Sequence, residues 1–260
     1  MRFSNTLEMT SYFDIFMLWE GWIYLLILSI LEIVLGIDNI LFISIITDDL
    51  EPKAQKKARN IGLSIALILR LALLSVVSLL MQLTDPIFTI FNTPLSAQSI
   101  ILLFGGLFLI YKSVSEMHKS ISHEHESESK KKKGLINIIG QIVIIDLVFS
   151  FDSIISAVGM TNGVGSETNA DPIAIIVFAI VISMIIMIIF AKQISDFITN
   201  NPTIKMIALS FLVAVGILLI SEAFGQHFPK GYIYFALAYA LFVEMLNIRM
   251  RKNKLKNGSK

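Results

Sequence analysis

The stretches EIVLGIDNILFIS (residues 32–44) and DLVFSFDSIISAV (residues 146–158) are two versions of one pattern. Each begins with an acidic residue, has an aspartate six residues later, and is otherwise almost entirely apolar. The two align without gaps, so that Glu32 matches Asp146 and Asp38 matches Asp152. The pattern predicts an internal repeat in which each copy carries buried carboxylates.

The composition places this repeat in a lipid bilayer. Of 260 residues, 55% are hydrophobic and 16% are charged, and the mean hydropathy is +0.76, which is too apolar for a soluble domain. The chain has no cysteine, which excludes disulfides and thiolate metal sites. The net charge of +1 gives no reason to expect a nucleic-acid partner.

Seven apolar windows are long enough to span a membrane as helices, which need about 20 apolar residues. Helices satisfy their own backbone in lipid, and the windows lack the alternating pattern of a β-barrel. The sequence therefore predicts an all-α, polytopic membrane protein with seven transmembrane helices. The expected spans are residues 23–46, 61–83, 97–111 and slightly beyond, 135–160, 173–191, 204–224 and 231–248.

The repeat extends beyond the acidic stretches. Residues 92–116 and 201–222 both lead from Asn and Pro into a glycine-bearing helix that ends in Ser and Glu. Chance similarity between apolar helices is the alternative, but the shared acid spacing argues against it. We therefore predict two inverted three-helix repeats plus a seventh helix, because an odd number of crossings turns the second copy over. Within a single transmembrane domain (1–260), the expected parts are repeat 1 (about 22–117), a cytoplasmic loop (about 118–134), repeat 2 (about 135–227), the seventh helix (about 231–248) and a basic tail (249–260).

Lysine and arginine alternate from loop to loop. They cluster after the first and third spans, flank the fifth-to-sixth connection and fill the tail, whereas the other loops hold only Lys230 and the amino terminus only Arg2. The positive-inside rule then predicts an external amino terminus and a cytoplasmic carboxyl terminus.

Acids in mid-membrane cost about 2.5–3.5 kcal/mol each on insertion scales, so several of them need a function. Residues six apart in a regular helix differ by about 240° and 9 Å, so the two acids of one copy converge only if the helix breaks. Gly36 and Asn39 favour a break that also exposes carbonyl oxygens; Ser150 makes a break in the second copy less expected. Facing copies would form an oxygen-rich site suited to manganese, magnesium or calcium. The candidate metal ligands are Glu32, Asp38, Asn39, Asp146 and Asp152.

Charge pairing is the alternative use of these acids. Arg70 in the second span and Lys112 in the third are candidate partners, although they cannot neutralise every buried acid. The loop after the third span holds His118, His123 and His125 before four lysines, which is typical of a solvated segment. A weak metal-sensing role for that loop is the second interpretation.

The two acidic stretches, together with SEAFGQHFPKGYIYFALAYALFVEMLN (residues 221–247), closely resemble signature stretches of the TerC family of integral membrane proteins. The resemblance covers about Trp22 to Asn247 and implies a seven-helix, multi-pass protein of the plasma membrane. The family name derives from tellurium resistance, but several members resemble manganese exporters, some linked to metal supply for metalloproteins outside the cytoplasm. By position, the resemblance implies that the five candidate ligands are the functional residues of this chain. Glu116 and Glu222 lie near helix ends and are expected to line an access path or handle protons.

The sequence thus favours a secondary transporter that exports divalent cations, most of all manganese, in exchange for protons. Manganese would be the transported substrate and not a cofactor. A membrane scaffold for metalation, envelope stress or tellurium resistance is one alternative. An intramembrane aspartyl protease using Asp38 and Asp152 is a weaker one, because it leaves Glu32 and Asp146 unexplained. We therefore do not expect an enzyme.

Overall fold

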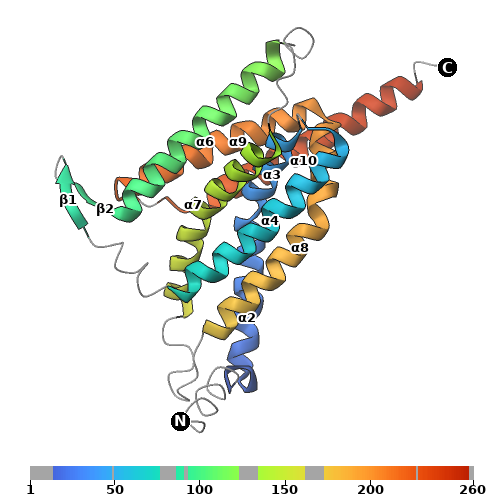
Figure 1. The fold of residues 1–260 in the computed structure, drawn as a ribbon. Helices are drawn as coiled ribbons and strands as arrows, with labels where there is room; N and C mark the ends of the chain where they lie inside the picture. Colours follow the sequence, from blue (N-terminus) through green and yellow to red (C-terminus); the bar gives the residue numbers. More distant parts are fainter. Residues whose placement is uncertain are drawn as a thin grey trace, which may run out of the picture. The chain divides into compact units, whose positions relative to one another are not determined.

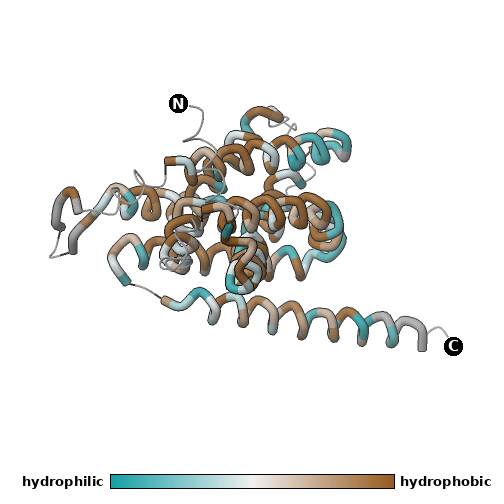
Figure 2. The backbone as a smooth tube through the Cα atoms, turned by 90° about the horizontal axis from the view of Figure 1, so that it is seen from below, coloured by the Kyte–Doolittle hydropathy of each residue, from teal (hydrophilic) through white to brown (hydrophobic). Residues whose placement is uncertain are grey.

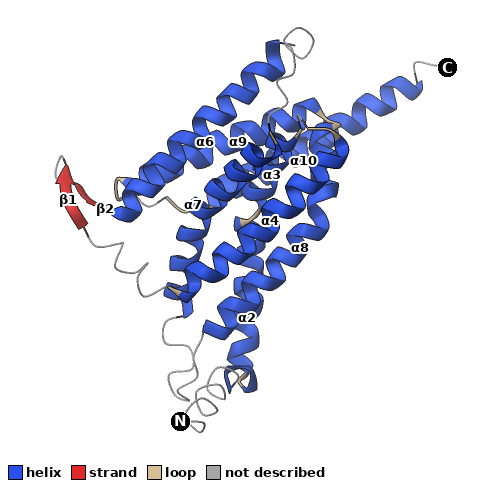
Figure 3. Ribbon diagram, in the orientation of Figure 1, coloured by secondary structure: helices blue, strands red, loops and turns tan. Residues whose placement is uncertain are grey.

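The computed structural model describes residues 14–48, 50–76, 86–90, 93–122, 134–161, 173–226 and 228–257. Within these ranges seven helical spans are long and apolar enough to cross a membrane, which confirms the all-α, seven-helix prediction (Figure 3). The spans are Trp19–Thr47, Lys53–Ser75, Ala97–Ser122, Leu135–Thr161, Ile173–Thr199, Pro202–Ala223 and Gly231–Arg251.

The chain divides into two compact units, each assembled from separate parts of the sequence. The first unit comprises residues 1–83 and 132–194. Its elements are η1 (Ile15–Met17), α2 (Trp19–Leu35), α3 (Ile37–Thr47), α4 (Pro52–Ser75), α7 (Leu135–Thr161) and most of α8 (Ile173–Thr199). Helix α7 packs against α2, α3 and α4. Every residue of α3 from Asp38 to Thr47 is buried, as expected for a helix that is apolar on all sides.

The second unit comprises residues 84–131 and 195–260. It contains β1 (Pro86–Ile90), β2 (Thr93–Ser96), α6 (Ala97–Ser122), α9 (Pro202–Ala223) and α10 (Gly231–Asn257). Helix α6 packs along α9, and α10 also contacts α9 (Figure 1). The strands form an antiparallel hairpin with an irregularity between Pro86 and Phe88. This hairpin was not predicted from the sequence, because its strands of five and four residues carry little periodicity.

The units do not coincide with the sequence repeats. The first two helices of each repeat lie in the first unit, namely α2–α3 with α4 and α7 with α8. The third helix of each repeat, α6 or α9, lies in the second unit with α10. The first helices of the two repeats, α2–α3 and α7, therefore pack together in one unit, and the third helices, α6 and α9, pack together in the other.

The predicted helix break is present in the first copy, but it is confined to one residue. Gly36 separates α2 from α3 with φ −88° and ψ −3°. Its N–H donates to the carbonyl oxygen of Glu32 (2.9 Å), and its own carbonyl oxygen accepts from Ile40 (3.1 Å). The expectation that an unwound segment frees this carbonyl was therefore wrong. Helix α7 passes through Ser150 without interruption, consistent with serine in place of glycine.

Several helices extend beyond their apolar windows, as the polar ends in Figure 2 show. Helix α10 continues to Asn257 and α6 to Ser122, so the expected tail and loop begin as helix. Lysine and arginine are good helix formers and are favourable near helix carboxyl ends, which explains both extensions. Helix α4 starts at Pro52 and α9 at Pro202, because proline is tolerated where no backbone donor is needed. Residues 77–83 of the expected second span lie outside the described residues.

Candidate functional site

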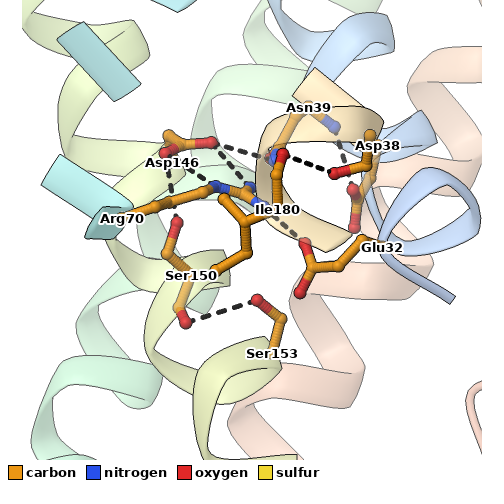
Figure 4. Close-up of polar contacts among 9 residues, drawn as sticks. Glu32, Asp38, Asn39, Arg70, Asp146, Ser150, Ser153 and Ile180 are labelled. Carbon is orange, nitrogen blue, oxygen red and sulfur yellow. Dashed lines mark hydrogen bonds and ion pairs between the residues drawn. The ribbon is translucent and has the colours of Figure 1, made fainter. Parts of the chain in front are cut away.

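The first unit contains a cluster of charged side chains that is almost completely shielded from solvent. Arg70, Glu32, Asp38 and Asp146 are each 1–3% exposed, and Asn39 is equally buried. They come from α2, α3, α4 and α7, so both repeats contribute (Figure 4). Because buried charges are costly unless paired, the contacts within this cluster determine what it can bind.

Arg70 connects the two repeats. Its Nη1 donates to Oε2 of Glu32 at 2.8 Å, and its Nη2 donates to Oδ1 of Asp146 at 2.8 Å. Its Nε reaches Oδ2 of Asp146 at 3.4 Å. The planar guanidinium group suits this arrangement, because it directs several donors into one plane. One cation therefore pairs with a carboxylate of each repeat, as the pairing interpretation predicts for Arg70.

The contacts of Asp146 continue into the first copy of the pattern. Its Oδ1 accepts from Nδ2 of Asn39 at 3.0 Å, and its Oδ2 accepts from the Ser150 hydroxyl at 3.1 Å. The backbone N–H of Asn39 donates to Oδ1 of Asp38 at 2.9 Å. Asp38 lies in the first turn of α3, where the helix dipole favours a negative charge. The bend at Gly36 thus gives Asp38 a stabilised place beside the cluster.

The contacts follow the symmetry of the repeat. Asn39, late in its copy, reaches Asp146, which is early in the other copy. The matching residue Ser153, late in the second copy, faces Glu32, which is early in the first (Figure 4). Equivalent positions that meet each other in this way require the two helices to run antiparallel. This arrangement supports the predicted inversion of the second repeat.

Two oxygen atoms of the cluster lack a hydrogen-bond partner among the described residues. They are Oε1 of Glu32 and Oδ1 of Asn39, both fully buried. With all groups ionised, the three carboxylates and the one guanidinium leave a formal charge of −2. Unpaired buried oxygens and an excess negative charge are what a hard divalent cation would satisfy. The donor set therefore fits manganese, magnesium or calcium by ligand type.

The expected five-ligand cage is present only in part. Within the described ranges, no group of three or more His, Cys, Asp or Glu side chains lies close enough to hold a metal unaided. Arg70 occupies the position between Glu32 and Asp146 that a shared cation would take. The Asp152 side chain lies outside the described residues, although its backbone belongs to α7.

The remaining candidates belong to the second unit. Glu116 on α6 is buried and pairs with Lys119 at 2.8 Å, while Glu222 on α9 lies 3.6 Å from Lys230. Lys112 is half-buried on α6. Of the histidines in the expected loop, His118 is exposed on α6. His123 and His125 lie outside the described residues.

Sequence reasoning did not assign a role to Ser150 and Ser153. Both hydroxyls are buried in the cluster. Ser150 lies four residues after Asp146, which places the two on the same helix face. That spacing is the signal that could have identified Ser150 as a partner of the carboxylate.

The seven spans, the antiparallel acidic helices and the buried charge cluster define a polytopic helical membrane protein built on an inverted repeat. The model of the integral membrane protein TerC family matches residues 17–258. The chain belongs to this family, which confirms the resemblance seen in its sequence.

Similar proteins include two that are named as inner membrane proteins. A UPF0053 protein of Haemophilus influenzae is 47% identical over 235 residues, covering 90% of this chain and 95% of that protein. The UPF0053 inner membrane protein YgdQ of Escherichia coli is 45% identical, covering 91% and 96%. The inner membrane protein YoaE of the same species is 41% identical, covering 92% of this chain but 45% of the longer relative. No solved structure matches the chain.

Proposed function

We propose that this protein is a secondary transporter that exports divalent metal cations, most of all manganese, from the cytoplasm across the plasma membrane. The main support for this proposal is the buried cluster of charged side chains in the first unit. It combines excess carboxylate charge with two unpaired oxygen atoms, those of Glu32 and Asn39. Ionisable residues in a membrane interior are costly and commonly mark an ion pathway.

The proposed ligands are Glu32, Asp38, Asn39, Asp146 and Asp152. All offer oxygen, and hard cations such as manganese prefer oxygen over thiolate or imidazole. A formal charge of −2 in the described cluster matches one divalent ion. The same charge repels anions, so tellurite is disfavoured as a direct substrate. In the metal-free site the acids that Arg70 does not pair with can hold protons, and metal entry would displace these protons, which provides exchange with protons.

The proposed transport movement is a rocking of elements around a fixed site, as inverted repeats permit. Glu116 and Glu222, near the ends of α6 and α9, are proposed to line the access path, and Lys112 to balance charge there. The basic first turns of α4 and the basic end of α10 support an external amino terminus and a cytoplasmic carboxyl terminus. Metalloproteins outside the cytoplasm are the proposed recipients of the exported metal.

The test is flux in proteoliposomes under an imposed pH gradient, with manganese, magnesium and calcium compared. We expect the wild-type protein to move manganese. Asp38→Asn should abolish flux, because it removes a ligand charge while an amide oxygen can still accept the Asn39 N–H. Glu20→Gln is the matched control: the same chemical change at an exposed position of α2 should leave flux intact.

Three results would contradict the proposal in different ways. Unchanged flux in Asp38→Asn would remove Asp38 from the ligand set. A wild-type protein that moves none of the three cations would refute transport and favour the scaffold alternative. Cleavage of a membrane peptide that requires Asp38 and Asp152 would instead favour the protease alternative.

A further inference from the structure

Arg70 already occupies the acidic site as a cation. The guanidinium lies 2.8 Å from oxygens of both Glu32 and Asp146, one acid from each repeat. Arg70 is 2% exposed, so water contributes little to balancing the charge of these carboxylates. Two of the acids predicted to bind a metal are therefore paired without one.

This arrangement is not symmetric, although the acids are. Arg70 is supplied by α4, the second helix of the first repeat. The second helix of the second repeat, α8, has no charged residue from Ile173 to Ala191. Arg59, also buried on α4, is 11 residues away, or about 16 Å along a helix. Among the described residues, Arg70 makes ion pairs with both Glu32 and Asp146.

A divalent cation and this guanidinium compete for the same two carboxylates. Metal ligation requires direct contact with a carboxylate oxygen, and Oδ1 of Asp146 and Oε2 of Glu32 are each engaged by an Arg70 nitrogen. Two cations at such short range in a buried site also repel each other strongly. Arginine cannot relieve the conflict by losing its proton. Its long, flexible side chain can relieve it by moving.

We propose that Arg70 is a tethered counter-cation: it occupies the carboxylates of Glu32 and Asp146 when the site holds no metal, and it withdraws when metal binds. The inference rests on the proposed function and specifies which cation partly balances the acids when no metal is bound. Because Glu32 and Asp146 are then paired, the carrier can return without a bound metal. Arg70 thereby permits net export and also lowers the apparent affinity for metal, since metal must displace it.

Removing the tethered charge separates these two effects. In Arg70→Gln the metal-free site has uncompensated buried carboxylates, which strongly disfavours the empty state. The return step then needs a bound metal, so metal-for-metal exchange continues while net export slows. Metal binding becomes tighter, because no internal cation competes for the oxygens.

The experiment measures two fluxes in proteoliposomes at equal pH on both sides. Net efflux of radioactive manganese into metal-free buffer is compared with efflux into buffer containing unlabelled manganese. We expect the ratio of net to exchange flux to fall at least about tenfold in Arg70→Gln, as expected for an unpaired buried charge. Manganese titration in detergent should show tighter binding than in the wild type. Arg249→Gln, at an exposed position of α10, is the matched control and should behave as the wild type.

Arg70→Lys keeps the inference testable if the glutamine variant does not fold. Lysine retains one charge but lacks the planar fork that bridges two carboxylates. Its flux ratio should therefore lie between wild type and glutamine, with metal binding tighter than in the wild type. A wild-type flux ratio with unchanged or weaker metal binding in the folded variants would overturn the inference alone. A wild-type protein that moves no divalent cation would overturn the proposed function together with it.

Discussion

The contact between α6 and α9 leaves no room for a side chain at Gly106. A Cβ added there would lie 2.6 Å from the carbonyl oxygen of Gly216 and 2.8 Å from Cγ1 of Ile220, whereas ordinary contact begins at 3.4 Å. The nearest atom is backbone, so rotamer changes cannot remove the clash. The helices must separate by roughly 0.8 Å, a gap that forfeits a quarter to a half of the dispersion energy at the contact. We therefore expect Gly106→Ala to cost about 1–3 kcal/mol in packing.

Gly140 on α7 provides the control, because a Cβ added there meets nothing within 4 Å. Both substitutions are glycine to alanine in helices, so the gain in helix propensity, about 1 kcal/mol, cancels in the comparison. Gly106→Ala should therefore be less stable than Gly140→Ala by about 1–3 kcal/mol. The assay is reversible unfolding in mixed micelles, with helix content followed by circular dichroism. Equal unfolding midpoints for the two variants would refute close packing of α6 on α9.

Further predictions concern both units. Asp146→Asn should destabilise the fold by at least about 1.5 kcal/mol more than Glu32→Gln. Asp146 accepts hydrogen bonds from Arg70, Asn39 and Ser150, whereas Glu32 accepts from Arg70 and keeps an unpaired oxygen. Equal unfolding free energies for the two variants would contradict this. Gly216→Ala should lower the unfolding midpoint in the same assay, since its Cβ would lie 2.9 Å from the Gly106 carbonyl oxygen; a midpoint at or above the wild-type value would count against it. Lys119→Ala should change stability by no more than about 0.5 kcal/mol, because Lys119 is half-exposed and its pair with Glu116 is a local one; a larger loss would show that the pair stabilises more than its own helix.

The features that were predicted well from the sequence, such as the helices and the repeat, depend on patterns that extend over many residues. The apolar windows located all seven helices, because the bilayer fixes both their length and their composition. The shared acid spacing identified the repeat, and the contact between Asn39 and Asp146 supports its inversion. Gly36 was identified as the site of a break, because glycine has a low helix propensity and lies within an otherwise apolar helical stretch.

The features that sequence could not predict depend on how distant segments pack. Nothing in the chain order showed that each repeat divides between two units. Arg70 was recognised as a candidate partner, but no local pattern showed that it bridges Glu32 and Asp146. The ends of α6 and α10 were misplaced because hydropathy marks the membrane boundary, whereas the backbone continues in helix into polar sequence.

The two copies of the acidic pattern differ in backbone conformation and in their charged neighbours, whereas a symmetric site would have both the same. The first copy bends at Gly36 and lies beside the helix that supplies Arg70, while the second runs straight through Ser150. A Cβ at Gly36 would clash with the side chain of Met187, so the absence of a side chain at this position lets α8 approach the first copy closely. Inverted-repeat transporters alternate access by moving one part against another around a fixed site. The bend, the close approach of α8 and Arg70 all lie at the first copy, so in a carrier of this kind the two copies would not be equivalent partners in that movement.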